Sequence, residues 1–231
     1  MAFKNRRKEK TQAEIIVADN PTSIVSEQIR TIRTNIQFSM VDQKLQTLLV
    51  TSATPASGKT TIATNIAAAF AAENNQVLLV ATDMRKPRLQ KIFNTENTRG
   101  LSTLITNPTL KVEDVAEKTY IENLSVITSG PIPPNPSELL NSNRMSNLIE
   151  EMKEQYDLVI FDSPPLLAVT DAQIISTKVD GTIFVIPVGD VKTDEVHQAS
   201  ERLKNVDAKV LGTVLNKVER NADTYYYYGQ D

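Results

Sequence analysis

The chain has 231 residues, of which 40% are hydrophobic and 23% charged, so it can bury a sizeable core and is not a wholly disordered chain. Lys and Arg number 25 against 28 Asp and Glu, and the net charge of -3 argues against a broad nucleic-acid-binding surface. The absence of cysteine excludes disulfides and thiolate chemistry, and a single histidine, His197, leaves no histidine cluster for zinc.

The amino-terminal stretch is basic, with cations at Lys4, Arg6, Arg7, Lys8 and Lys10. No apolar segment follows it, and no apolar run reaches the ~18 residues that cross a bilayer. We therefore expect no signal peptide and a cytoplasmic protein. Its basic arm at residues 1–19 is either a solvated terminus or a contact for an anionic membrane surface or an acidic partner.

A helix is predicted over residues 20–40, with Asn20 as its N-cap and Pro21 in its first turn. Glu27, Arg30 and Arg33 recur every three residues and therefore share one face of that helix. Taken alone, this spacing is typical of a solvated face.

Six short segments rich in Val, Ile and Leu are typical of strands that are covered on both faces of a parallel sheet. They are residues 47–52, 76–82, 124–129, 157–162, 182–188 and 209–216. Helical segments lie between them, at residues 59–73, 136–155, 171–178 and 193–205, and the stretch 94–123 is expected to hold one or two short helices. The alternation predicts a doubly wound, mostly parallel α/β sheet in one domain over residues 1–220.

Residues 53–60 read ATPASGKT and nearly match the phosphate-loop pattern G-x-x-x-x-G-K-S/T, between a predicted strand and a predicted helix. In such a loop the backbone N–H groups and the helix N-terminus face phosphate oxygens, Lys59 reaches the β- and γ-phosphates, and the Thr60 hydroxyl binds Mg²⁺. Ala53 replaces the first glycine of the pattern, at a cost of about 1 kcal/mol if a positive φ were required there. The predicted nucleotide-binding residues here are Thr54, Pro55, Ala56, Ser57, Gly58, Lys59, Thr60 and Thr61.

An aspartate closes the apolar run at residues 158–162 and is followed by Ser163-Pro164-Pro165. Ligands of open α/β sheets bind at the carboxyl ends of the strands, so Asp162 should point toward the phosphate loop. It suits a Walker B carboxylate that holds Mg²⁺ directly or through water.

The motifs occur together in one order that resembles the cytoplasmic domain of bacterial tyrosine kinases (BY-kinases), which govern capsule and exopolysaccharide synthesis. The resemblance covers residues from about 26 to 228. It rests on the phosphate loop, the second strand with Arg85-Lys86-Pro87, the segment SGPIPPNPSELL at residues 129–140, the D-S-P-P at 162–165 and the terminal Tyr225, Tyr226, Tyr227 and Tyr228. It implies a P-loop NTPase of the Walker A and deviant Walker A′ type that transfers phosphate from ATP, with Mg²⁺, to protein tyrosines.

In the resembled family the second strand ends in two aspartates separated by one residue, and an arginine follows after one more. Asp83 and Arg85 match this motif, but Ala81 stands where the first aspartate, thought to accept the tyrosine proton and organise Mg²⁺, belongs. Loss of a general base typically costs 10²–10⁴-fold in rate, so a weakly active enzyme is expected. The implied roles are catalysis for Lys59, Asp83 and Asp162, Mg²⁺ binding for Thr60, Asp83 and Asp162, and nucleotide contacts for Arg85 and, by analogy with related P-loop ATPases, Asn216 and Lys217.

Four of the six tyrosines, Tyr225–Tyr228, follow the last predicted strand in a polar flank, so residues 221–231 are interpreted as a flexible acceptor tail rather than as an edge strand or an interface patch. The resemblance implies autophosphorylation in trans within a ring in which Glu27, Arg30 and Arg33 contact a neighbour. It also implies a separate membrane-spanning modulator that recruits the protein to the inner face of the membrane. A cognate tyrosine phosphatase and sugar-nucleotide enzymes are candidate substrates.

Two alternatives remain. A partitioning-type ATPase shares the expected fold, but its signature lysine would stand at Thr54, and the tyrosine tail would have no role. A nucleotide-binding assembly switch without catalysis is the other, because Ala81 could remove the chemistry and leave ATP-driven assembly.

Overall fold

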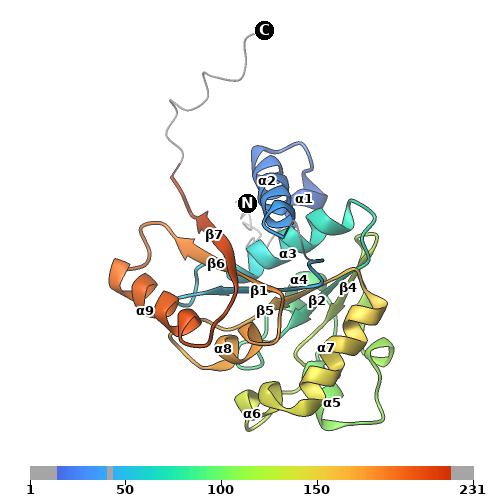
Figure 1. Cartoon of the computed structure of the whole chain (residues 1–231). Helices are drawn as coiled ribbons and strands as arrows, with labels where there is room; N and C mark the ends of the chain where they lie inside the picture. The colour runs from blue at the N-terminus through green and yellow to red at the C-terminus, as the bar shows by residue number, and fades with distance from the viewer. Residues whose placement is uncertain (1–14, 41–43, 220–231) are drawn as a thin grey trace, which may run out of the picture.

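A twisted seven-stranded sheet with helices on both faces organises the protein, and the computed structural model describes residues 15–40 and 44–219 (Figure 1). The strand order is β3-β4-β2-β5-β1-β6-β7, in which only β3 runs antiparallel to its neighbour. The strands are β1 (Thr47–Ser52), β2 (Val77–Ala81), β3 (Glu117–Lys118), β4 (Leu124–Ile127), β5 (Leu158–Asp162), β6 (Gly181–Pro187) and β7 (Val210–Asn216). The predicted doubly wound, mostly parallel sheet is confirmed.

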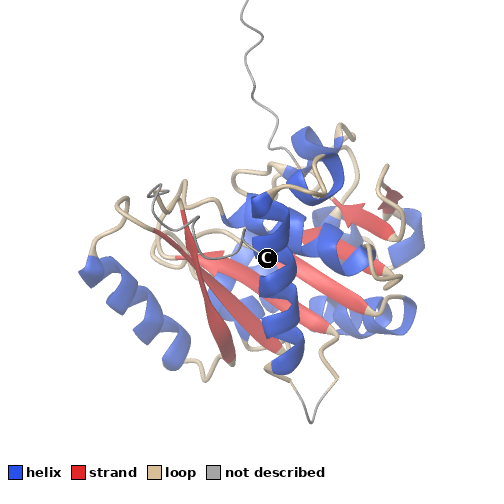
Figure 2. Cartoon of the chain, turned by 90° about the horizontal axis from the view of Figure 1, so that it is seen from above, coloured by secondary structure: helices blue, strands red, loops and turns tan. Residues whose placement is uncertain are grey.

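The central strands are buried along their whole length, because each alternates its side chains between two covered faces. In β1, Leu48 and Val50 pack toward one helical layer, whereas Leu49 packs toward the other. Figure 2 shows the strands fanning out between these layers.

One layer contains α1 (Ile16–Asp19), α2 (Ile24–Phe38), α3 (Lys59–Ala71) and α4 (Leu89–Phe93). The opposite face is covered by α5 (Leu101–Thr106), α6 (Pro136–Asn141), α7 (Asn143–Gln155), α8 (Asp171–Ser176) and α9 (Thr193–Lys204). Helix α3 is alanine-rich and buried on almost every side, which lets it lie close against β1, β2 and β5.

Two local predictions were wrong. Helix α2 begins at Ile24, with Ser23 rather than Asn20 as its N-cap, because the Ser23 hydroxyl accepts the Ser26 N–H at 3.1 Å. The helix predicted over residues 136–155 is broken at Ser142, whose extended backbone (ψ 155°) ends α6 and whose hydroxyl caps α7. The stretch 94–123 holds α5 and a 3₁₀ turn (Val112–Asp114), as expected, and also the unpredicted strand β3.

Two predicted features lie outside the described residues: most of the basic arm at residues 1–19, and the tail with Tyr225, Tyr226, Tyr227 and Tyr228. Within the described ranges, no helix combines the length and the apolar character needed to cross a membrane.

Candidate active site

The turn between β1 and α3 adopts a phosphate-loop shape. Gly58 has a φ of 85° and Ala56 a φ of 61°, so both occupy the left-handed region. Ala53 is not among the residues with positive φ; its methyl group is buried against a cluster with Leu166 and Phe184. Ala53 therefore carries no backbone strain from a positive φ. The alanine that does carry this strain is Ala56.

Asn216, at the end of β7, supports this loop from one side. Its side-chain amide donates a hydrogen bond to the Ser57 carbonyl at 2.9 Å, and the Ser57 hydroxyl donates to the Thr54 carbonyl at 2.7 Å. A Cβ added at Gly58 would lie 2.1 Å from the Asn216 amide nitrogen. The positive φ favours glycine at position 58, and a Cβ there would also displace the Asn216 amide that supports the loop.

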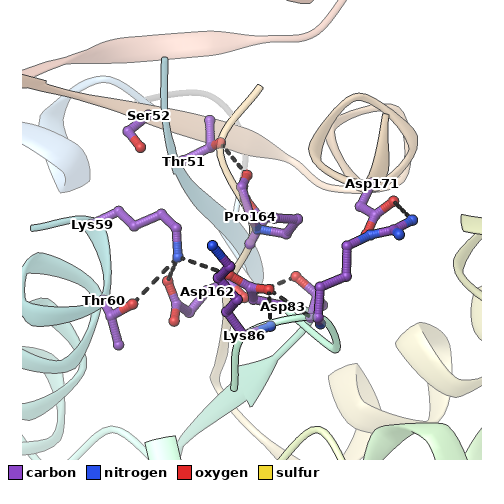
Figure 3. Close-up of polar contacts among 12 residues, drawn as sticks. Thr51, Ser52, Lys59, Thr60, Asp83, Lys86, Asp162, Pro164 and Asp171 are labelled. Carbon is purple, nitrogen blue, oxygen red and sulfur yellow. Dashed lines mark hydrogen bonds and ion pairs between the residues drawn. The ribbon is translucent and has the colours of Figure 1, made fainter. Parts of the chain in front are cut away.

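Lys59 begins α3 and lies between two carboxylates (Figure 3). Its Nζ is 3.3 Å from Asp162 Oδ1 and 3.6 Å from Asp83 Oδ2, and it also lies 3.4 Å from the Thr60 hydroxyl. The side chains of Lys59 and Asp83 are 12% exposed and that of Asp162 only 4%. The structure therefore brings together every side chain predicted to act in catalysis or to bind Mg²⁺.

Burial raises the pKa of Asp162, and the nearby charge of Asp83 raises it further. Lys59 and a hydrogen bond with the Thr60 hydroxyl oppose the shift without cancelling it. Two partly desolvated carboxylates beside one ammonium group leave a site that gains from an added cation. Carboxylate and hydroxyl oxygens are the ligand types that Mg²⁺ prefers, so these residues fit the ion.

Ala81 is the last residue of β2 and pairs in register with Asp162 of β5. It is 2% exposed and packs in the same core cluster as Ile160, so its methyl group faces the α3 layer. The next residue, Thr82, donates both its N–H and its hydroxyl to the Asp162 carbonyl, at 2.8 and 2.9 Å. A side chain at position 81 would therefore extend beside the Asp162 carboxylate.

A pocket opens in front of the phosphate loop. The residues that line it are Pro55, Ala56, Ser57, Gly58, Lys59, Thr60, Thr61, Asp83, Arg85, Lys86, Arg88, Pro164, Pro165, Ala168 and Val169. Most of the predicted nucleotide-binding residues are in this lining. Thr54, Asn216 and Lys217 are not: Thr54 supports the loop from behind, and the Lys217 ammonium pairs with Asp190 at 2.7 Å.

Arg85 is held by a residue that sequence reasoning missed. Its Nε lies 3.2 Å from Oδ2 of Asp171, the first residue of α8. The only signal for Asp171 in the sequence was an acidic residue in the first turn of a helix, a common and uninformative feature.

The predicted interface trio does not share one environment. Arg30 pairs with Glu27 on the exposed side of α2 and also donates to the Pro21 carbonyl at 2.6 Å. Arg33 instead packs on α3: it donates to the Ala69 carbonyl of that helix and lies 2.7 Å from Glu73, just beyond the helix end. Arg33 therefore joins two helices of the same chain. The prediction that all three side chains share one solvated face is wrong for Arg33.

Comparison with known proteins places this geometry in context. The family model described as "AAA domain" matches residues 46–217. Tyrosine-protein kinase YwqD of Bacillus subtilis is 42% identical over 231 residues, which cover 99% of this chain and 97% of YwqD. Tyrosine-protein kinase etk of Escherichia coli is 35% identical over 227 residues; the match covers 98% of this chain and 31% of etk, so this chain spans about a third of its length.

Solved structures agree. The kinase domain of Escherichia coli tyrosine kinase ETK superimposes with a TM-score of 0.86 at 34% identity, over 98% of this chain and 88% of that one. The cell division ATPase MinD of Pyrococcus furiosus, at 21% identity and a TM-score of 0.64 over 77% of this chain and 74% of its own, shares the fold alone.

Proposed function

The chain belongs to the bacterial tyrosine-protein kinases built on an AAA-type P-loop domain, and from that membership we propose that it phosphorylates the tyrosines at 225–228 of a neighbouring copy with ATP and Mg²⁺. The observation that carries the proposal is the position of Lys59 within 3.6 Å of both Asp83 and Asp162 at the mouth of the phosphate loop. We assign residues 1–220 to the kinase domain and 221–231 to the acceptor tail.

The phosphate loop supplies the nucleotide contacts in this proposal. Backbone N–H groups of residues 56–61 face the phosphates from the start of α3, and Lys59 balances the charge of the terminal phosphates. Thr60, Asp83 and Asp162 would hold Mg²⁺, which when bound neutralises charge on the transferred phosphoryl group. Asp83 lines the pocket and is the carboxylate that can receive the tyrosine proton in place of the missing aspartate at Ala81.

Transfer in trans can be tested by complementation. A tail-deleted protein lacking residues 221–231 is mixed with Mg-ATP and a full-length Lys59→Met protein, and phosphotyrosine is measured on the latter. Labelled Lys59→Met protein supports the proposal, because that chain has an acceptor but no phosphate-binding lysine. If the full-length parent labels itself but the Lys59→Met protein in the mixture stays unlabelled, transfer between copies is contradicted.

We further propose that a ring of copies, with Glu27 and Arg30 at the contacts and Arg33 supporting the helix that carries them, sets up this transfer. A membrane-spanning modulator would recruit the ring to the inner face of the membrane, where it regulates capsule or exopolysaccharide synthesis. The support is the likeness to etk and YwqD and the exposed Glu27–Arg30 pair. A phosphatase and sugar-nucleotide enzymes are the further substrates to test.

A second candidate function is a nucleotide-dependent assembly switch without catalysis, and the observation that favours it is the buried methyl group of Ala81 beside Asp162. Phosphotyrosine that forms only after Ala81→Asp, with unchanged nucleotide affinity, would support the switch. The partitioning-type alternative gains no such support, because Thr54 occupies the position of that group's signature lysine and MinD shares only the fold.

A further inference from the structure

Three motifs that are far apart in the sequence meet at one buried carboxylate. The Asp171 side chain is fully buried, and its two oxygens receive hydrogen bonds from Arg85 Nε at 3.2 Å and Arg85 Nη2 at 3.4 Å. Ser137, in the segment PNPSELL, donates its hydroxyl to Asp171 Oδ1 at 2.7 Å and accepts from Arg85 Nη2 at 3.1 Å. The three side chains form a closed hydrogen-bonded ring.

Only Arg85 of these three residues lines the pocket. Asp171 and Ser137 lie behind it, at the starts of α8 and α6. Figure 3 shows Asp171 well apart from Lys59 and Asp162, on the far side of Pro164. Any effect of Asp171 on the reaction must therefore pass through Arg85.

The ring is not explained by stability alone. The Arg85 side chain is 39% exposed, so water weakens its attraction to Asp171, and the burial of the Asp171 carboxylate carries a desolvation cost. What a two-point contact with a carboxylate does fix is the plane and direction of the guanidinium group. Within the described part of the chain, Arg85 Nη1 makes no hydrogen bond, so that edge of the guanidinium group is available to an anion.

The position of Arg85 indicates which anion it meets. The phosphate loop and Lys59 form one wall of the pocket, and Asn216 supports that loop from outside the pocket. Arg85 lies with Lys86 and Arg88 in the wall that follows β2, and Pro164, Pro165, Ala168 and Val169 provide the apolar part of the lining. Apolar side chains beside cations suit a phenol ring that is gaining a phosphate.

We propose that Asp171 and Ser137 are positioning residues that aim Arg85 at the phosphoryl group as it arrives on the acceptor tyrosine. This rests on the proposed kinase site. In the step, the phenol oxygen bonds to the γ-phosphorus while the bond from that phosphorus to the β,γ-bridging oxygen breaks; ADP leaves, and the phenol proton passes to Asp83. Arg85 then offsets charge on the transferred group from the side opposite Lys59.

The test uses the full chain and its Ala81→Asp form, a peptide of residues 219–231 as acceptor, and saturating Mg-ATP. Asp171→Asn and Ser137→Ala are compared with Arg85→Lys. We expect kcat to fall about tenfold or more in Asp171→Asn and Arg85→Lys, because the charge-assisted bonds that orient the guanidinium are lost. In Asp171→Asn and Ser137→Ala, ATP affinity and the KM for the peptide should stay within about twofold of the parent, since neither residue lines the pocket and the interaction develops only as phosphate is transferred. The double variant Asp171→Asn/Arg85→Lys should be no slower than Arg85→Lys alone, because Asp171 acts through Arg85.

Asp180→Asn is the matched control. Its carboxylate accepts hydrogen bonds from the Gln46 and Thr47 N–H groups and the Thr47 hydroxyl, at the opposite ends of the strands, so its loss should lower Tm and leave kcat unchanged. An unchanged kcat in both Asp171→Asn and Ser137→Ala overturns the inference, and so does a kcat loss that Asp180→Asn reproduces. Phosphorylation that survives Lys59→Met, or that is absent in both backgrounds, overturns the proposed function itself.

Discussion

Ala81 and Asp162 are register partners in the parallel strands β2 and β5, and both end their strands where α3 begins. The Asp162 carboxylate reaches Lys59 at 3.3 Å, whereas the Ala81 methyl group offers no ligand. The site as it stands has two carboxylates around one lysine.

Ala81→Asp should raise phosphotransfer by about 10²–10⁴-fold, because it restores a base beside the metal site. The same change should lower the free energy of unfolding without nucleotide by about 1–3 kcal/mol, since a third carboxylate then shares Lys59. Phosphotyrosine formation and urea unfolding, each with and without Mg-ATP, measure the two effects. Ala81→Asn is the control of equal size; an equal gain in activity there would rule out the base.

Lys59→Met should weaken ATP binding by about 30-fold or more, because the loop loses the charge that faces the terminal phosphates. Titration calorimetry measures the affinity. Lys204→Met, whose side chain is 78% exposed on α9, serves as the control and should bind like the parent. Parent-like ATP affinity in Lys59→Met would refute the nucleotide site.

Ala56→Gly should stabilise the protein by up to about 1 kcal/mol, because alanine at φ 61° is strained and glycine is not. Ala53→Gly should instead destabilise it, since Ala53 has no positive φ and its methyl group packs against Leu166 and Phe184. Urea unfolding compares the pair. Opposite signs are the expected result; a gain from Ala53→Gly would mean that the strain lies at the start of the loop after all.

The raised pKa of Asp162 predicts how stability changes with pH. Relative to Asp162→Asn, the parent should lose stability as pH rises from the ordinary aspartate pKa of 3.8 to the raised folded-state value, because the folded state binds the proton more tightly than the unfolded state. Below 3.8 and above the folded-state pKa the difference should be flat. Urea midpoints from pH 3 to pH 8, taken without Mg²⁺, check this; a parent that gains stability relative to the variant over that window would reverse the sign.

Arg33→Met should lower both Tm and assembly, whereas Glu27→Gln should lower assembly alone. Arg33 connects α2 to Glu73 and Ala69 at the end of α3, and losing those bonds should cost about 1 kcal/mol. The Glu27 side chain is 68% exposed, and within the described residues its only ion pair is with Arg30, so its loss should cost little stability. Light scattering and thermal melts separate the effects; assembly unchanged in Glu27→Gln would remove that residue from the interface.

The sheet and the site core were predictable because their signals are local. Apolar runs set the six predicted strands, and each ended within two residues of its predicted bounds. Because ligands of parallel sheets bind at the carboxyl ends of the strands, the sequence also predicted that Asp162 points toward the phosphate loop that holds Lys59. Strand β3 carried no such signal, because two exposed residues, Glu117 and Lys118, pair by their backbone alone.

Other features depended on contacts between distant segments. Ser23 displaced Asn20 as the cap because the α1 turn folds back on α2: the Ser26 hydroxyl, which lies 2.9 Å from that of Ser23, also lies within hydrogen-bond distance of the Ile16 and Asn20 carbonyls. In the sequence, Asp171 is one more acidic residue in the first turn of a helix. Its role depends on the fold, which brings it into contact with Arg85, a residue 86 positions earlier in the chain. The helix spacing of Arg33 gave no sign that α3 would lie beneath it.

The hydrogen bond from Asn216 to Ser57 reduces the conformational entropy that the phosphate loop loses when a nucleotide binds. A glycine-containing turn that was loose in the free protein would have to become ordered on binding, which weakens affinity. Here the last parallel strand already holds the turn through this hydrogen bond, and the Asn216 amide lies directly against Gly58. The cradle is consequently preorganised, and Asn216→Ala should slow ATP association as well as weaken the equilibrium affinity.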